Sequence, residues 1–198
     1  APASVAQSPG FELTDAGYFE RGGVSVMAFQ DFYPDGHQGG VTVVQHGVRI
    51  AANGDLRLHA TPGQWDPVPK QDSREVVGGE IVTRLSYPDP GKNRTGFNPI
   101  VYPDLEMSYS VRARAEGDAV VVTVDLDAPL PDAYVGVVGF NLELYPVDLF
   151  GKGWIMGEVM GQFPRQPNGP MAVDAAGVAQ ALPFASGPTL TIAPEDDA

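Results

Sequence analysis

The stretch Leu105–Asp127, LEMSYSVRARAEGDAVVVTVDLD, decides the fold class. As far as Arg114, apolar and polar residues alternate, and the apolar set is Leu105, Met107, Tyr109, Val111 and Ala113. A period of two places one set on a buried face and the other in water, as in antiparallel strands. The residues AEGD (Ala115–Asp118) predict a turn, and the alternation resumes over Ala119–Asp127. The stretch therefore predicts a β-hairpin with one buried face.

Strand-like segments recur along the whole chain, and the others are Val24–Phe29, Val41–His46, Glu80–Tyr87, Val137–Tyr145 and Thr189–Ile192. No segment has the 3.6-residue apolar period of an amphipathic helix, and the best helix candidate, Ala172–Leu182, is broken by Gly177. Short strands between Gly- and Pro-containing turns predict an all-β protein, an antiparallel β-sandwich of jelly-roll or immunoglobulin-like type. We expect less than about 15% helix.

The two ends of the chain differ from its middle. We expect a flexible N-terminal segment at 1–10, a single β-sandwich domain over 11–193, and an acidic tail or linker at 194–198. The opening residues, APASVAQSPG, are small and polar, as at an end left by removal of a signal peptide. The sequence therefore predicts a secreted or periplasmic bacterial protein that continues beyond Ala198.

Charge and composition exclude several classes of function. The formal net charge of −13 disfavours nucleic acid and anionic membrane surfaces, because both are negatively charged, whereas a neutral polysaccharide is not repelled. The absence of Cys excludes disulfides and thiol catalysis. No apolar run approaches the ~20 residues of a membrane span. The three His lack the short spacing of zinc sites, so no metal or other cofactor is predicted.

The segment HGVRIAANGDLRLHATPGQWDPVP, His46–Pro69, contains the strongest turn signal. Asn-Gly tolerates the positive φ angles of a type I′ turn, so Asn53 and Gly54 predict a hairpin between the strands Val48–Ala52 and Asp55–His59. On that register the polar face carries Arg49, Asp55 and Arg57.

Catalytic patterns are weak. Glycoside hydrolysis requires two facing carboxylates. The acidic residues available for this are Asp31, Asp55, Asp66, Asp104 and Glu143, and none lies in a repeat such as E-x-D-x-x-E. The sequence therefore predicts no catalytic residue.

A polysaccharide lyase is the alternative enzyme class. Such an enzyme needs a base and cationic groups to neutralise a uronate. The basic residues Arg49, Arg57, His46 and His59 lie close together in the sequence, and Tyr102 is a possible proton donor. The Arg-rich and Gln-x-His motifs of jelly-roll lyases are absent, which disfavours this class.

Two Trp residues lie among turn-forming residues, Trp65 and Trp154. A Trp in a polar loop either stacks on a sugar ring or docks a neighbouring domain. The surrounding run Phe150–Pro170, FGKGWIMGEVMGQFPRQPNGP, is too apolar for a solvated linker. We expect its apolar side chains to cover a surface, with Trp154 as the anchor.

Three stretches of sequence together carry a family resemblance. The first is His46–Pro69. The second is Asn98–Asp118, NPIVYPDLEMSYSVRARAEGD, and the third is Gly139–Trp154, GFNLELYPVDLFGKGW, followed by Gly161–Pro170, GQFPRQPNGP. They resemble the N-terminal region of large secreted bacterial glycoside hydrolases of the family-9 or six-hairpin type. The resemblance implies a β-sandwich that precedes an (α/α)6-barrel, and the barrel holds the catalytic acids. It covers about Phe11 to Pro170. An R-x-N-Q-x-G-Y phrase and the D-A-G-D motif are missing, so no catalytic residue is transferred.

Two functions follow. The first is a non-catalytic module that packs on a catalytic (α/α)6-barrel and helps to shape its sugar cleft. The second is a free-standing carbohydrate-binding β-sandwich or lyase-like enzyme. The candidate contacts to polysaccharide or to the partner domain are Arg49, Asp55, Arg57, Trp65, Tyr102, Glu143 and Trp154.

Overall fold

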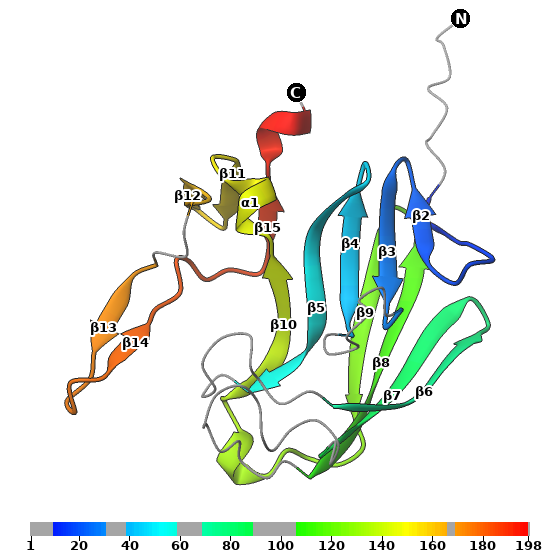
Figure 1. Cartoon of the computed structure of the whole chain (residues 1–198), viewed down its shortest axis with the longest axis horizontal. Helices are drawn as coiled ribbons and strands as arrows, with labels where there is room; N and C mark the ends of the chain where they lie inside the picture. The colour runs from blue at the N-terminus through cyan, green and yellow to red at the C-terminus, as the bar shows by residue number, and fades with distance from the viewer. Residues whose placement is uncertain (1–9, 31–38, 59–68, 89–105, 166–168, 198) are drawn as a thin grey trace, which may run out of the picture. The chain divides into compact units, whose positions relative to one another are not determined.

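A computed structural model describes residues 10–30, 39–58, 69–88, 106–165 and 169–197 (Figure 1). Its contacts divide the chain into two compact units, residues 1–143 and 144–198, where a single domain over 11–193 was expected. The division arises because, among the described residues, the strands after 144 pair with one another and not with the strands of the first unit.

The first unit contains a six-stranded antiparallel sheet in the order β1-β2-β3-β4-β5-β10 (Figure 1). Its strands are β1 (Glu12–Leu13), β2 (Phe19–Arg21), β3 (Val24–Ala28), β4 (Val41–Gln45), β5 (Val48–Leu58) and β10 (Val138–Leu144). Neighbours in this sheet follow one another along the chain until β10, which returns beside β5. Tight glycine turns make this meander possible, for example at Gly22 and Gly23, where φ is positive.

The second sheet of this unit has the order β6-β7-β8-β9. Its strands are β6 (Lys70–Val77), β7 (Glu80–Tyr87), β8 (Met107–Glu116) and β9 (Ala119–Leu126). The hairpin predicted over 105–127 is confirmed over its described residues, because Glu116 pairs with Ala119 and Gly117 in the turn has a φ of 60°.

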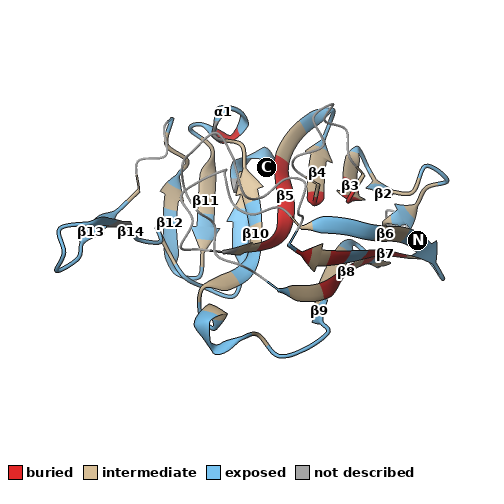
Figure 2. Cartoon of the chain, turned by 60° about the horizontal axis from the view of Figure 1, so that its bottom comes forward, coloured by how far each residue is buried: buried red, intermediate tan, exposed pale blue. Residues whose placement is uncertain are grey.

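The core lies between these two sheets. The β8 residues predicted to point inward, Tyr109, Val111 and Ala113, are at most 1% exposed. Other members of the same buried cluster come from both sheets and include Phe19, Val26, Val41, Leu56, Ile81 and Leu85. Figure 2 shows the buried positions gathered along β5, β7 and β8. The predicted antiparallel β-sandwich is confirmed.

The second unit is built from small sheets. β11 (Gly153–Met156) lies between β12 (Val159–Gln162) and β15 (Leu190–Ile192). β13 (Met171–Val173) and β14 (Ala179–Ala181) form a separate hairpin, in the place of the best helix candidate.

Helix is confined to short turns in the described ranges. These are η2 (Asp132–Tyr134), α1 (Pro146–Leu149) and η3 (Pro194–Asp197), which confirms the expected low helix content. None of these helices has the length and apolar character needed to cross a membrane. η3 occupies the predicted acidic tail, where a Glu195 carboxylate oxygen accepts a hydrogen bond from Gly153 N at 2.7 Å.

The hairpin predicted at Asn53-Gly54 is wrong. β5 continues through both residues, and β4 pairs along it with register shifts, with Val41 opposite Gly54 and Val43 opposite Ala51. Two residues of β4 thus span three of β5, which is a β-bulge. Asn53 has a φ of 56°, so the residue type that favours a type I′ turn here forms the bulge instead. The pairing with β4 decides the outcome, and a local turn signal does not contain that information.

The bulge changes which side chains point inward. Residues 51–56 are all buried, and Asp55, which was expected on the polar face, is only 2% exposed. The bulge interrupts strict alternation, so the assignment of faces derived from a flat hairpin fails from Asn53 onward.

Replacing Gly54 by Val is expected to destabilise the fold for a steric reason. A Cβ at Gly54 would lie 2.7 Å from the Val41 Cβ and 3.1 Å from Leu142 Cδ1, so the neighbouring strands would have to move. We expect a loss of about 2 kcal/mol in the free energy of unfolding, measured in urea. Gly139→Val is the matched control, because a Cβ at Gly139 meets no atom within 4 Å. Equal losses in the two variants would contradict the close approach.

Candidate functional site

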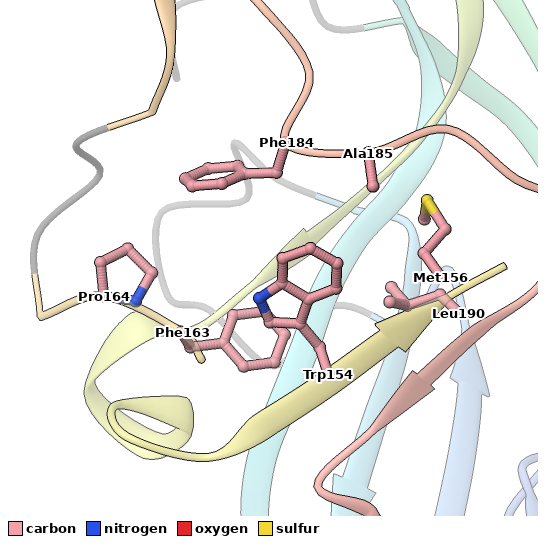
Figure 3. Close-up of a pocket in the computed structure, with 7 residues that line it drawn as sticks. All are labelled: Trp154, Met156, Phe163, Pro164, Phe184, Ala185 and Leu190. Atoms are coloured by element: carbon pink, nitrogen blue, oxygen red, sulfur yellow. The ribbon is translucent and has the colours of Figure 1, made fainter. Parts of the chain in front are cut away.

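A pocket with an apolar lining lies in the second unit and has a cavity volume of about 180 Å³. Figure 3 shows its lining side chains, which are Trp154, Met156, Phe163, Pro164, Phe184, Ala185 and Leu190. Alternate residues of β11, Trp154 and Met156, point to the pocket side, and Leu190 reaches it from β15, which pairs with β11. The segments after β12 and before β15 complete it.

The position of Trp154 depends on the strand that pairs with it. Trp154 lies opposite Gly161 in the register of β11 and β12, and a Cβ at Gly161 would be only 2.6 Å from indole Cζ2. The indole therefore lies directly on the β12 backbone. Its ring packs edge-to-face with Phe184 at a centroid distance of 6.4 Å and an interplanar angle of 71°, a favourable aromatic geometry.

Replacing Gly161 by Ala should displace the indole. The added methyl overlaps the present position of the ring, so Trp154 must leave the β12 backbone. In a Trp65→Phe background, where Trp154 is the remaining Trp, we expect a shifted emission maximum, stronger quenching by acrylamide and a stability loss of about 1 kcal/mol. Gly139→Ala in the same background is the control. Unchanged emission in the Gly161 variant would contradict this packing.

The pocket suits an apolar guest. Its lining has no ionisable side chain. A cavity of about 150 Å³ lined by aliphatic and aromatic groups accommodates benzene, so this pocket fits a ring or a branched aliphatic side chain. A sugar would need several hydrogen-bonding side chains to satisfy its hydroxyl groups, and the side chains of this lining supply one good donor, the indole N–H of Trp154.

The surface of the second unit is also apolar. Of the eighteen large hydrophobic residues that are exposed in the described part of the chain, eleven lie in this smaller unit. They include Met160 at 75% exposed and Val147 at 88% exposed. By contrast, Leu149 is the single buried hydrophobic residue among those described after residue 144.

Of the acidic candidates of the first unit, Asp55 and Glu143 are described and are engaged in internal hydrogen bonds, whereas Asp31, Asp66 and Asp104 lie outside the described residues. Asp55 Oδ1 accepts from the Tyr109 hydroxyl at 2.8 Å and from Leu56 N at 2.8 Å, inside the core. Glu143 on β10 accepts from Asn53 Nδ2 at 2.7 Å. The Tyr109–Asp55 and Asn53–Glu143 hydrogen bonds were not anticipated from the sequence, because each joins strands that are distant along the chain.

The Arg candidates follow β5. Arg49 is half-buried near the start of the strand. Arg57 Nε is buried and has no hydrogen-bond partner among the described residues, and the positive charge of Arg57 acts on Asp55. Trp65 and Tyr102 lie outside the described residues. No group of three or more His, Asp or Glu that could hold a metal ion occurs in the ranges that the structure covers.

The described site candidates therefore belong to different units of the chain. Trp154 lies in the pocket of the second unit, whereas Asp55, Glu143, Arg49 and Arg57 lie on β5 and β10. The sequence identified Trp154, Met156 and Phe163 as surface-covering residues but missed Phe184 and Leu190. Leu190 falls within the predicted strand Thr189–Ile192, and this strand prediction was the one feature of the sequence that could have pointed to Leu190 as a pocket residue.

Comparison with known proteins adds no assignment, because no family model, no curated protein and no solved structure matches this chain.

Proposed function

We propose that this chain is a non-catalytic β-sandwich module of a secreted glycoside hydrolase and that the pocket of the second unit docks on the helical catalytic domain. The observation that carries the proposal is the pocket itself, which is apolar, centred on Trp154 and surrounded by exposed hydrophobic side chains. The secretion and the glycoside hydrolase partner come from the sequence resemblance.

The second unit has little core of its own. A small domain needs to bury most of its apolar side chains to be stable. Here the large side chains of Val147, Phe150, Met160 and Phe184 are more than half exposed. Covering each such side chain contributes about 1.5–3 kcal/mol, so a partner surface that covers several of them is strongly favoured. Large exposed apolar areas are typical of protein interfaces.

The described acids support a non-catalytic role. A glycosidase holds two carboxyl groups across an open cleft. Asp55 is buried in the core, where it accepts a hydrogen bond from Tyr109, and the Glu143 carboxylate accepts a hydrogen bond from the side-chain amide of Asn53. These two acids, which the sequence places on strands, are thus occupied by structural hydrogen bonds.

Carbohydrate binding by the isolated module is the alternative, and Trp154 is the observation that favours it, since an indole can stack on a sugar ring. The apolar lining around Trp154 disfavours it, because a bound sugar would leave hydroxyl groups without partners. Retention of the chain on insoluble polysaccharide, lost in Trp154→Ala, would support this alternative over docking.

The test begins with the gene. Docking on a catalytic domain requires a helical domain with paired carboxylates encoded in the same or an adjacent reading frame. That domain, expressed with and without this chain, is then assayed for release of reducing ends from a panel of β-glucans. We expect the chain alone to give no turnover and the combination to be more active or more stable than the catalytic domain alone.

Two results would overturn the proposal. One is turnover by the isolated chain that is abolished by Glu143→Gln, which would make the β-sandwich the enzyme. The other is the absence of any encoded helical catalytic domain.

A further inference from the structure

A buried polar cluster joins the two sheets of the first unit. Asp55 on β5 belongs to the six-stranded sheet, and Tyr109 on β8 belongs to the four-stranded sheet. The Tyr109 hydroxyl donates to Asp55 Oδ1 at 2.8 Å, and both side chains are at most 2% exposed. Tyr87 on β7 stacks on Tyr109 at a centroid distance of 6.2 Å, and its hydroxyl donates to Leu56 O at 3.4 Å.

Few charged groups face this carboxyl in the described structure. Arg57, on the same strand, lowers the pKa of Asp55 by its charge, but this is the smallest of the influences on Asp55. The titratable groups from the opposite sheet are Tyr109 and Tyr87. On the flanking strands, β10 contributes Glu143, which is held by Asn53, and β4 has the uncharged sequence VTVVQ.

Burial dominates the protonation of Asp55. Removal from water raises the pKa of its carboxyl from 3.8 to about 6, because the hydrogen bonds from Tyr109 and Leu56 offset only part of the desolvation. Burial also raises the pKa of Tyr109, so its hydroxyl keeps its proton and stays a donor over the whole neutral range. The cluster therefore changes charge at one group, Asp55.

We propose that the Asp55–Tyr109 pair is a pH-sensitive joint between the two sheets, which holds the sandwich most firmly when the Asp55 carboxyl carries a proton. The geometry supports this because the carboxyl lies between the sheets, where its charge cannot reach water. A second polar link between the sheets, from Arg74 Nε on β6 to Ala28 O at 2.7 Å, carries a permanent cation and does not titrate in this range.

The direction of the effect follows from linkage. The folded pKa of Asp55 lies above its unfolded value, so the folded state binds the proton more tightly. The stabilisation is complete below the unfolded pKa of 3.8 and is lost as the pH rises through about 6. Two surface acids act in the opposite sense. A hydrogen bond from Lys70 lowers the pKa of Asp72, and hydrogen bonds from Arg84 lower the pKa of Asp127. The stability that these two carboxylates contribute is therefore lost only as the pH falls below their ordinary pKa of 3.8. Mild acid to neutral pH therefore separates the effect of Asp55 from those of Asp72 and Asp127, and comparison with a variant at Asp55 removes the contributions of other groups.

The test compares the wild-type chain with Asp55→Asn, which keeps an acceptor oxygen for Tyr109 but cannot ionise. Unfolding in urea gives the folding equilibrium constant of each protein. We expect the ratio of the variant's constant to that of the wild type to rise roughly 25-fold between about pH 4.5 and pH 7.5. Asp118→Asn, at an exposed turn, is the matched control and should show a constant ratio. Tyr109→Phe removes the hydrogen bond that stabilises the ionised Asp55 carboxylate, so the stability lost between about pH 4.5 and pH 7.5 should be larger in this variant than in the wild type.

A second measurement uses the wild-type protein alone, so it does not depend on whether a variant folds. The carboxyl carbon resonance of Asp55 in the wild-type protein should titrate with a midpoint near pH 6. A midpoint below about 4.5 would overturn the proposal, since an ordinary Asp titrates near 3.9. So would an Asp55→Asn ratio that stays constant with pH.

Discussion

Replacing Tyr109 by Ala is expected to remove about 5 kcal/mol from the free energy of unfolding of the first unit. Tyr109 is fully buried and belongs to the cluster that joins both sheets. Two losses combine in this variant. Truncating a buried aromatic ring to a methyl group costs about 3–5 kcal/mol through lost burial and the cavity left behind. The Asp55 carboxyl also loses a donor inside the core, which costs about 1–3 kcal/mol.

This loss is comparable to the whole stability of a typical domain, about 5–15 kcal/mol, so Tyr109→Ala should be largely unfolded at 37 °C. Urea unfolding followed by circular dichroism measures the loss. Tyr109→Phe separates the two contributions, because it keeps the ring and its stacking on Tyr87 but removes the hydroxyl. We expect Tyr109→Phe to retain the fold with a loss of about 1–3 kcal/mol. A loss below about 2 kcal/mol in the Ala variant would show that the core at Tyr109 is loosely packed.

The importance of Tyr109 could be predicted from the sequence, but its partner could not. The alternation from Leu105 to Asp127 correctly placed Tyr109 on the inward face, because the side-chain period of a strand is a local property. The contact with Asp55 requires knowledge of how one sheet stacks on the other. It also requires the bulge at Asn53, which reverses the expected orientation of Asp55. Both depend on pairing between distant strands.

The residues of the candidate pocket could also be predicted only in part from the sequence. Trp154 was singled out because it is a large aromatic residue among Gly and Pro residues, and the pocket is indeed centred on it. Phe184 was missed because it lies in a segment without periodicity, and it reaches Trp154 only through the folding of the chain after β14. The sequence also gave no sign that residues after 144 form their own sheets. Short strands of three or four residues have too few positions to show alternation.

If the proposed docking holds, replacing Trp154 by Ala is expected to weaken binding of the chain to the proposed catalytic domain by about 2–4 kcal/mol, or roughly 30-fold or more in Kd. Buried Trp residues at the centre of an interface carry a large share of its binding energy, since one side chain covers a large apolar area. Trp154 lies at the centre of the pocket, held by the backbone at Gly161 and by the ring of Phe184. Its removal would take away the largest of the seven side chains that line the pocket and so reduce the apolar surface on which a guest side chain would rest.

Ile155→Ala is the matched control, because Ile155 is the next residue on β11, is exposed and does not line the pocket. Its loss should change the affinity by less than about 1 kcal/mol, as is usual for residues outside the centre of an interface. Isothermal titration calorimetry with the helical catalytic domain measures both variants, and thermal unfolding of each variant alone shows whether the second unit is intact. Equal effects at Trp154 and Ile155 would mean that the partner covers the apolar surface without using the pocket. No effect at either would place the docking surface elsewhere on the chain, because a side chain that fills the centre of an interface cannot be removed without a measurable loss of affinity.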